Sequence, residues 1–111
     1  MKVYKPSDAK VFMDGPEVFR EYVVTDKITF GSSTLLPGQT GGIDPGHPKS
    51  HEIFYAARGH VIVCNTTTNE YFELNEGDCL LIEEGEPHQI TNIGETVAVV
   101  TWSGAPSPSR V

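Results

Sequence analysis

The sequence predicts an all-β domain, arranged as a sandwich or a jelly-roll barrel. Helical periodicity is hard to find along the 111 residues, whereas short runs rich in β-branched and aromatic residues recur. Each run has the length of an ordinary strand and is bounded by Gly, Pro, Asn or Asp. Strands at this spacing, without helices between them, are typical of sandwiches and closed barrels.

The expected strands follow one another in order along the chain: Val18–Val24, Ile28–Leu36, Glu52–Ala57, His60–Cys64, Glu70–Leu74, Cys79–Ile82, Gln89–Ile93 and Thr96–Trp102. Glycine permits positive φ and proline holds φ near −65°, so dipeptides and tripeptides of these residues favour turns. Such turns lie at Pro37-Gly38, Gly41-Gly42, Asp44-Pro45-Gly46, Arg58-Gly59, Asn75-Glu76-Gly77 and Asn92-Ile93-Gly94. We expect one domain over residues 1–104 and, from its Pro- and Ser-rich composition, a flexible tail over residues 105–111.

Alternation along the third expected strand assigns its two faces. If Glu52 points into the barrel, Phe54 does so too, and Ile53 and Tyr55 point outward. A strand that is apolar on both faces is covered either by another part of the chain or by a second subunit. We favour a homodimer, although a second covering sheet of the same chain also explains the pattern.

Composition and charge exclude several classes of protein. The net charge is −7, and the acidic segment between Gly59 and Ser109 holds no Lys or Arg, so a phosphate backbone would be repelled and nucleic acid is not expected as a partner. No apolar run approaches the roughly 20 residues of a membrane span, and the N-terminus shows no signal-peptide pattern. We therefore expect a cytoplasmic protein in which Cys64 and Cys79 are reduced thiols.

Two short segments carry most of the histidines. The first runs from His47 to Gly59 and the second from Gly77 to Asn92. Imidazole and carboxylate groups on neighbouring strands form a ligand set for a divalent transition metal. The two segments also resemble the two signature motifs of the cupin superfamily, and the arrangement around His47 resembles germin-type cupins.

The spacing of both segments carries this resemblance. Six residues separate Glu52 from Gly59, as at the end of the first cupin motif, and His47 occupies its second histidine position. In the second motif Gly77, Gly85, His88 and Asn92 match, and Glu83 replaces the usual proline. The resemblance implies a cupin-type double-stranded β-helix, that is, a jelly-roll barrel.

The first motif also departs from the family pattern. Pro45 stands at its first histidine position and cannot bind a metal, and Gln39 replaces its opening glycine. The resemblance therefore implies a metal site of His47, Glu52 and His88 only.

A fourth ligand could come from the same loop or strand. His51 is one candidate, but strict alternation points it away from Glu52, so ligation would require an irregular backbone. Asp44 is a further candidate on the loop. His60 matches no ligand position, and we interpret it as a surface or interface residue. Ligand type restricts the metal to iron, manganese, nickel or zinc without choosing among them.

The expected function follows from such a metal in a barrel. Inward positions Phe54, Ile90 and Trp102 are candidate pocket residues, with Tyr22 as a further aromatic wall. The pocket would accept a keto acid, a hydroxy acid or a small sugar.

A metal in this pocket would support lyase or isomerase chemistry, or dioxygenase chemistry. Tyr22 and His51 are the candidate acid and base residues. A non-catalytic small-molecule-binding or sensor cupin and a metal-free structural cupin are the alternatives, because one fold hosts many functions.

Overall fold

The structure is a computed structural model that describes residues 1–108. It contains a short 3-10 helix, η1 (Pro6–Asp8), and the strands β1 (Lys10–Asp14), β2 (Glu17–Val24), β3 (Thr29–Leu35), β4 (His51–Arg58), β5 (Val61–Asn65), β6 (Glu70–Leu74), β7 (Cys79–Ile82), β8 (His88–Asn92) and β9 (Ala98–Ala105). No α-helix occurs in this part of the chain, so the all-β prediction is confirmed. No helix within residues 1–108 is long and apolar enough to span a bilayer.

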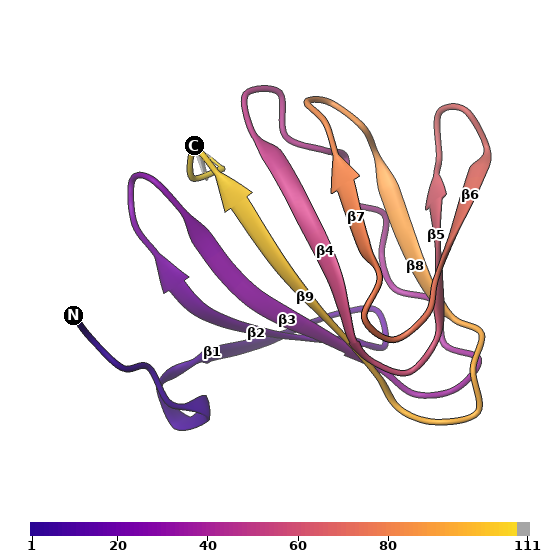
Figure 1. Ribbon diagram of the computed structural model, residues 1–111, viewed down its shortest axis with the longest axis horizontal. Helices are drawn as coiled ribbons and strands as arrows, with labels where there is room; N and C mark the ends of the chain where they lie inside the picture. The colour runs from indigo at the N-terminus through magenta and orange to yellow at the C-terminus, as the bar shows by residue number, and fades with distance from the viewer. Residues whose placement is uncertain (109–111) are drawn as a thin grey trace.

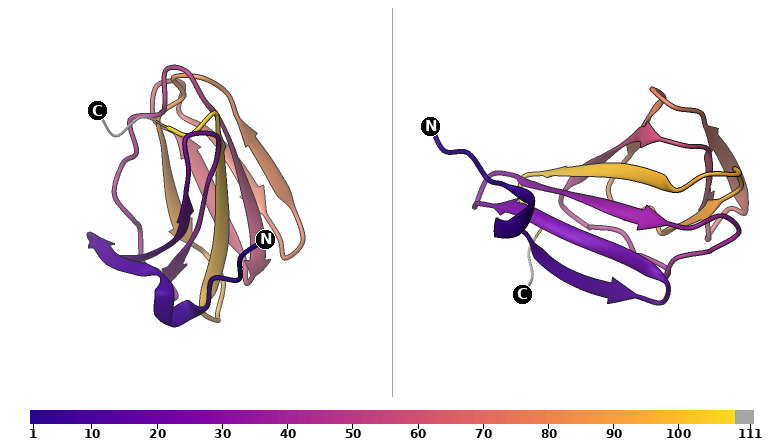
Figure 2. Two further views of the ribbon diagram at one scale, coloured as in Figure 1. Left: turned by 90° about the vertical axis from the view of Figure 1, so that its left-hand side faces the viewer. Right: turned by 90° about the horizontal axis from the view of Figure 1, so that it is seen from below.

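The strands form two antiparallel sheets. The larger sheet has the order β1-β2-β3-β9-β4-β7, and the smaller has the order β6-β5-β8. Figure 1 shows the strands in this succession from β1 to β7, with β8, β5 and β6 beyond β7. Figure 2 shows from two further sides how the larger sheet curves toward the smaller one. The order is that of a jelly roll, because strands distant in the sequence lie side by side, as β3 and β9 do.

The apolar core lies between the inner faces of the two sheets. Phe54 and Val100 come from the larger sheet, and Val61, Val63 and Ile90 come from the smaller one. In β4 buried and exposed residues alternate strictly. The predicted inward direction of Glu52 and Phe54 and the outward direction of Ile53 and Tyr55 are therefore confirmed.

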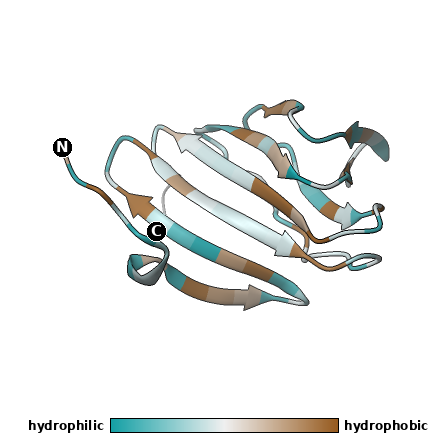
Figure 3. Ribbon diagram, turned by 60° about the horizontal axis from the view of Figure 1, so that its bottom comes forward, coloured by the Kyte–Doolittle hydropathy of each residue, from teal (hydrophilic) through white to brown (hydrophobic). Residues whose placement is uncertain are grey.

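All eight predicted strands are present, with ends shifted by up to three residues, but β1 was not predicted. Its apolar residues Val11, Phe12 and Met13 are consecutive, so they lack the alternation that signals a strand. Hydrophobic residues fill the middle of β1 (Figure 3), yet the whole strand is exposed at the edge of the larger sheet.

The expected tail begins inside a strand. Ala105 is the last residue of β9, and the Ser50 hydroxyl donates a 2.6 Å hydrogen bond to the Pro106 carbonyl. Residues 109–111 of the expected tail lie outside the described residues, so its flexibility stays a prediction. Cys64 and Cys79 are both free, as predicted.

Candidate metal centre

Four candidate ligands come from one loop and two strands. Asp44 and His47 lie on the loop between β3 and β4, Glu52 is the second residue of β4, and His88 is the first residue of β8. Two backbone hydrogen bonds of 2.9 Å, in which Asp44 and His88 each donate to the other, fix the loop against β8. The loop also turns at Gly46, whose φ of 86° suits glycine and whose Cα is too close to the Glu86 backbone for a side chain.

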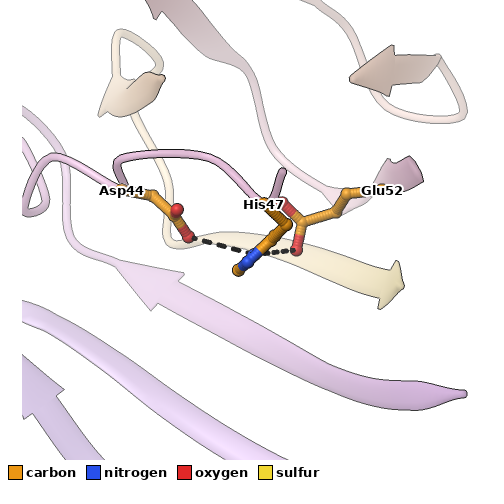
Figure 4. A group of neighbouring side chains, drawn as sticks. All are labelled: Asp44, His47 and Glu52. Carbon is orange, nitrogen blue, oxygen red and sulfur yellow. Dashed lines mark ion pairs between the residues drawn. The ribbon is translucent and has the colours of Figure 1, made fainter. Parts of the chain in front are cut away.

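The polar side-chain atoms of these residues lie close together. One donor atom each from Asp44, His47 and Glu52 lie within 4.8 Å of one another, and Figure 4 shows the three side chains pointing toward one another. His47 Nε2 lies 3.8 Å from Asp44 Oδ2 and 3.9 Å from Glu52 Oε2. His88 Nε2 approaches the same two carboxylates, at 3.7 Å from Asp44 Oδ2 and 3.1 Å from Glu52 Oε1. The two carboxylates are thus shared by the two imidazoles.

Asp44 and His88 each have a second polar side-chain atom that already forms a contact with the backbone. Asp44 Oδ1 accepts a 2.8 Å hydrogen bond from the Gly46 backbone N–H, and this leaves Oδ2 for a cation. His88 Nδ1 lies 2.8 Å from the Glu86 carbonyl, to which it can only donate. A neutral His88 therefore presents the lone pair of Nε2 to the centre; metal-binding histidines usually donate their other ring N–H to a carbonyl or carboxylate in this way.

Two buried atoms at this centre lack a hydrogen-bond partner. Glu52 Oε1 and His88 Nε2 are fully buried, and their 3.1 Å approach does not have hydrogen-bond geometry. Leaving buried polar atoms unpaired costs free energy, so such pairs need a ligand, an ion or water. The imidazole–carboxylate separations of 3.1–3.9 Å bracket the ~3.4 Å expected between two ligands of a tetrahedral metal with bonds near 2.1 Å, and Glu52 meets His47 with Oε2 and His88 with Oε1. The residues present therefore fit a divalent metal.

The electrostatics of the centre favour positive charge. Burial lowers the pKa of His88, but Glu52, the Glu86 carbonyl and Asp44 outweigh burial, so the net pKa of His88 is raised. Neighbouring carboxylates that favour a proton on imidazole favour a metal cation at the same place.

Comparison with known proteins identifies the family. A profile of the cupin domain matches residues 31–104, which include all four candidate ligands. The chain belongs to the cupin family.

Two curated relatives match part of this cupin. Germin-like protein subfamily 1 member 4 of Arabidopsis thaliana is 36% identical over 80 residues, which are 64% of this chain and 36% of the relative. An uncharacterized protein of Methanocaldococcus jannaschii is 37% identical over 67 residues, which are 60% of this chain and 46% of the relative. The chain therefore spans less than half the length of either relative.

Solved structures share the fold. KdgF from Halomonas sp. has a TM-score of 0.78 at 16% identity, with 99% of this chain and 96% of that chain covered. A predicted oxalate decarboxylase from Thermotoga maritima has a TM-score of 0.75 at 19% identity, with 94% of this chain and 98% of that chain covered. At these identities the comparison establishes the jelly roll and leaves the reaction open.

In this cupin the structure does not bring His51 to the metal centre. His51 points outward from β4, its side chain is 50% exposed, and its Nε2 lies 2.9 Å from Glu84 Oε1. The irregular backbone that ligation would require is absent at the start of β4, so Glu52 and His51 occupy opposite faces. Asp44, the other candidate on the loop and the immediate neighbour of Pro45, lies at the centre instead.

A cavity of about 660 Å³ adjoins the four candidate ligands. The expected pocket residues Phe54, Ile90 and Trp102 line this cavity. Tyr22 is not among its lining residues. It lies at the irregularity in the pairing of β2 with β3, and its ring packs against Phe30, 6.2 Å between centroids. The outer face of the sheet therefore holds both side chains that were expected to supply acid and base.

Sequence reasoning missed Glu17, a buried carboxyl in the same cavity. Burial raises the pKa of Glu17 to about 7; Asp14 and Asp44 add to the increase, and Ser33 and His88 oppose it. A glutamate at the start of a strand is expected to be exposed. Gly41 lies against this carboxyl, because a side chain at Gly41 would collide with it. The sequence gives no sign of this approach, which only the fold reveals.

His60 lies outside the metal centre, as expected. Its Nε2 is 2.6 Å from Glu73 Oε1 on the neighbouring strand, and its side chain is partly exposed. This pair involves none of the residues of the centre, which makes His60 a useful control position.

Proposed function

We propose that this cupin binds one divalent transition metal through His47, Glu52 and His88, with Asp44 as the fourth ligand. The protein would use this centre to transform a small oxygen-containing molecule by lyase or isomerase chemistry. The observation that carries the proposal is the grouping of Asp44, His47 and Glu52 with the neighbouring His88, in which Glu52 Oε1 and His88 Nε2 are buried and unpaired, beside a cavity large enough for a small molecule.

The ligand types favour a first-row transition metal, between the soft ions that prefer thiolates and the hard ions that prefer oxygen ligands alone. Two imidazoles and two carboxylates suit zinc, iron, manganese or nickel. When bound, such an ion would act as a Lewis acid that polarises a carbonyl or hydroxyl oxygen of the substrate. The protein's own part is to hold Asp44 and His88 in register through their paired backbones and to exclude water with Phe54, whose ring meets the His88 ring edge-on at 5.2 Å.

Proton transfer in the cavity would fall to Glu17. A general acid or base works best with a pKa near the working pH, and the pKa of Glu17 is raised to about 7. Tyr22 and His51, the earlier candidates, do not line the cavity within the described residues. Lyase and isomerase reactions both need a proton to be moved near a polarised substrate oxygen. A carboxyl in the same cavity as the metal, such as Glu17, could move that proton.

A non-catalytic binding or sensor cupin is the second candidate function. It is favoured by the position of Tyr22 and His51 outside the cavity. Without them, the titratable side chains that line the cavity within the described residues, apart from the candidate ligands, are three carboxyls: Asp14, Glu17 and Glu21. The two functions share the metal centre and differ only in turnover. Homodimer formation and a cytoplasmic location stay predictions under both.

Calorimetric titration of chelator-treated protein with Zn²⁺ and Mn²⁺ tests the centre. We expect one site per chain. His47→Ala should weaken metal binding more than 100-fold, because loss of an outer-shell partner alone costs about 10–100-fold. Asp44→Asn should weaken it about 10-fold or more. Circular dichroism of each variant checks that the fold is retained.

Two partly exposed histidines outside the centre serve as controls. His51→Ala and His60→Ala remove imidazoles that pair with Glu84 and Glu73, outside the centre, so metal affinity should change less than threefold. Equal losses in His47→Ala and His51→Ala would contradict the assignment. Purified protein that takes up no metal at any concentration would favour the metal-free structural cupin.

Turnover separates the enzyme from the binding module. Metal-loaded protein is incubated with a panel of keto acids, hydroxy acids and sugars, and products are followed by NMR. Turnover that disappears in His47→Ala supports the enzyme. Saturable binding without turnover across the panel would reject the enzyme and leave the sensor or carrier.

A further inference from the structure

The cavity has a second polar wall, distinct from the metal centre. Glu17 on β2, Ser33 on β3 and Trp102 on β9 line it, and they are 4%, 2% and 9% exposed. Ser33 pairs with Phe19 on one side and with Val100 on the other. Ser33 is therefore the diagonal neighbour of both Glu17 and Trp102 on the inner face of the larger sheet.

This wall contains unpaired polar atoms. Ser33 Oγ and Trp102 Nε1 are buried without a hydrogen-bond partner, like Glu52 Oε1 and His88 Nε2 at the metal centre. All four residues line the same cavity. Buried polar groups are nearly always satisfied, so the two unsatisfied ones in this wall, Ser33 Oγ and Trp102 Nε1, indicate a ligand that supplies the missing partners.

Trp102 is held in place by its neighbours. Its six-membered ring lies over Gly31, where a side chain would collide with it, and its indole meets the Phe19 ring edge-on at 6.2 Å. The indole N–H is thereby presented at a defined position. Because indole can only donate, the group that meets it must accept a hydrogen bond.

The charge of the cavity restricts that group further. Asp14, Glu17 and Glu21 line this part of it, and no Lys or Arg does so within residues 1–108. A ligand carboxylate would satisfy Trp102 but would face these acidic side chains. A hydroxyl can accept from Trp102 or Ser33 and donate to the Glu17 carboxyl.

We propose that Glu17, Ser33 and Trp102 form a recognition site for the hydroxyl groups of an uncharged, polyhydroxylated ligand, a sugar or a polyol. This inference rests on the proposed function and narrows its substrate class, because organic acids are disfavoured. Phe12 and Phe19 also line the cavity, where their rings stack on each other at 5.0 Å between centroids, and they give this wall an apolar flank for the C–H groups of a sugar.

Trp102 provides the assay, because it is the only tryptophan of the chain. Its indole ¹⁵N–¹H resonance is followed in metal-free protein during titration with neutral sugars and their matched uronates: glucose against glucuronate, galactose against galacturonate and mannose against mannuronate. We expect a saturable shift with at least one neutral sugar and at least tenfold weaker binding of its uronate. If no neutral sugar binds more tightly than its uronate, the proposal is overturned.

Adjacent serines on β3 give a matched pair of variants. Ser33→Ala should weaken binding of the neutral sugar at least fivefold, because it removes a hydrogen-bonding group of the wall. Ser32→Ala alters the opposite face of the same strand and should have no effect. Trp102→Phe, measured by calorimetry, should weaken sugar binding like Ser33→Ala. Equal affinities for wild type, Ser33→Ala and Ser32→Ala would overturn the proposal.

A Zn²⁺ titration of the same variants separates this proposal from the metal centre. Ser33→Ala should bind Zn²⁺ as wild type does, because Ser33 is not a ligand. Sugar binding without any metal binding would reject the proposed function and retain the wall. Metal binding with equal affinity for sugars and uronates would reject the wall and retain the metal centre.

Discussion

Replacing Glu17 with glutamine should remove a pH-dependent loss of stability. Burial, with the nearby charges of Asp14 and Asp44, raises the pKa of Glu17 from 4.5 to about 7. The folded protein therefore holds this proton between pH 4.5 and 7, whereas the unfolded chain has lost it. Because the folded state binds more protons in this window, the free energy of unfolding falls as the pH rises through it.

The size of the effect follows from the shift in the pKa of Glu17. A shift from 4.5 to about 7, at 1.36 kcal/mol for each pKa unit, corresponds to about 3 kcal/mol. Below pH 4.5 the carboxyl is neutral in both states and costs nothing. Above pH 7 the full cost is present. Glutamine has nearly the same shape and stays neutral, so Glu17→Gln should match wild type at pH 4 and exceed it by about 3 kcal/mol at pH 8.

Urea unfolding of metal-free protein, followed by fluorescence at pH 4, 6 and 8, measures this difference. At an m-value of about 1–3 kcal/mol/M, the midpoint of Glu17→Gln at pH 8 should lie about 1–3 M above that of wild type. Glu95→Gln, at an exposed position, is the control and should follow wild type at every pH. If the difference between Glu17→Gln and wild type does not change with pH, the reasoning about the buried carboxyl fails.

Three further predictions concern packing and assembly. Leu74→Ala should reduce the free energy of unfolding by about 2–5 kcal/mol in urea, because Leu74 is buried in the core, while Leu81→Ala at an exposed outer position should cost under 1 kcal/mol. Gly31→Ala should lower the melting temperature and move the Trp102 fluorescence maximum, since the new methyl collides with the indole; an unchanged spectrum would contradict that contact. Ile53→Glu should convert the expected dimer to a monomer in light scattering, because Ile53 is 43% exposed on the outer face of β4; a wild-type protein that is already monomeric would reject the dimer.

Local chemistry was enough to predict most strands. Turn residues and period-2 alternation placed β4 and its inward residues Glu52 and Phe54, because a strand's two faces follow directly from its geometry. The same rule indicated that His51 would point away from Glu52. The consecutive apolar residues Val11, Phe12 and Met13 show no alternation, and for that reason β1 was not found.

Three of the four candidate ligands could be named from motif spacing, but their meeting could not be derived from it. His47, Glu52 and His88 are brought together by the pairing of the β3–β4 loop with β8, a contact between segments about 40 residues apart. The importance of Asp44 depends on the same contact, because its two hydrogen bonds with His88 place its carboxylate between the imidazoles.

The sequence by itself determined the strand pattern, the direction of side chains within each strand and the types of donor atom available. Only the tertiary structure decided which of them share a cavity: Glu17 on β2 and Ser33 on β3 meet Trp102 on β9, a strand distant in the sequence that the sheet places next to β3. The physical reason is that strand periodicity is a local property of the backbone. Burial, the raised pKa of Glu17 and the unpaired Trp102 N–H arise from contacts between residues distant in the sequence.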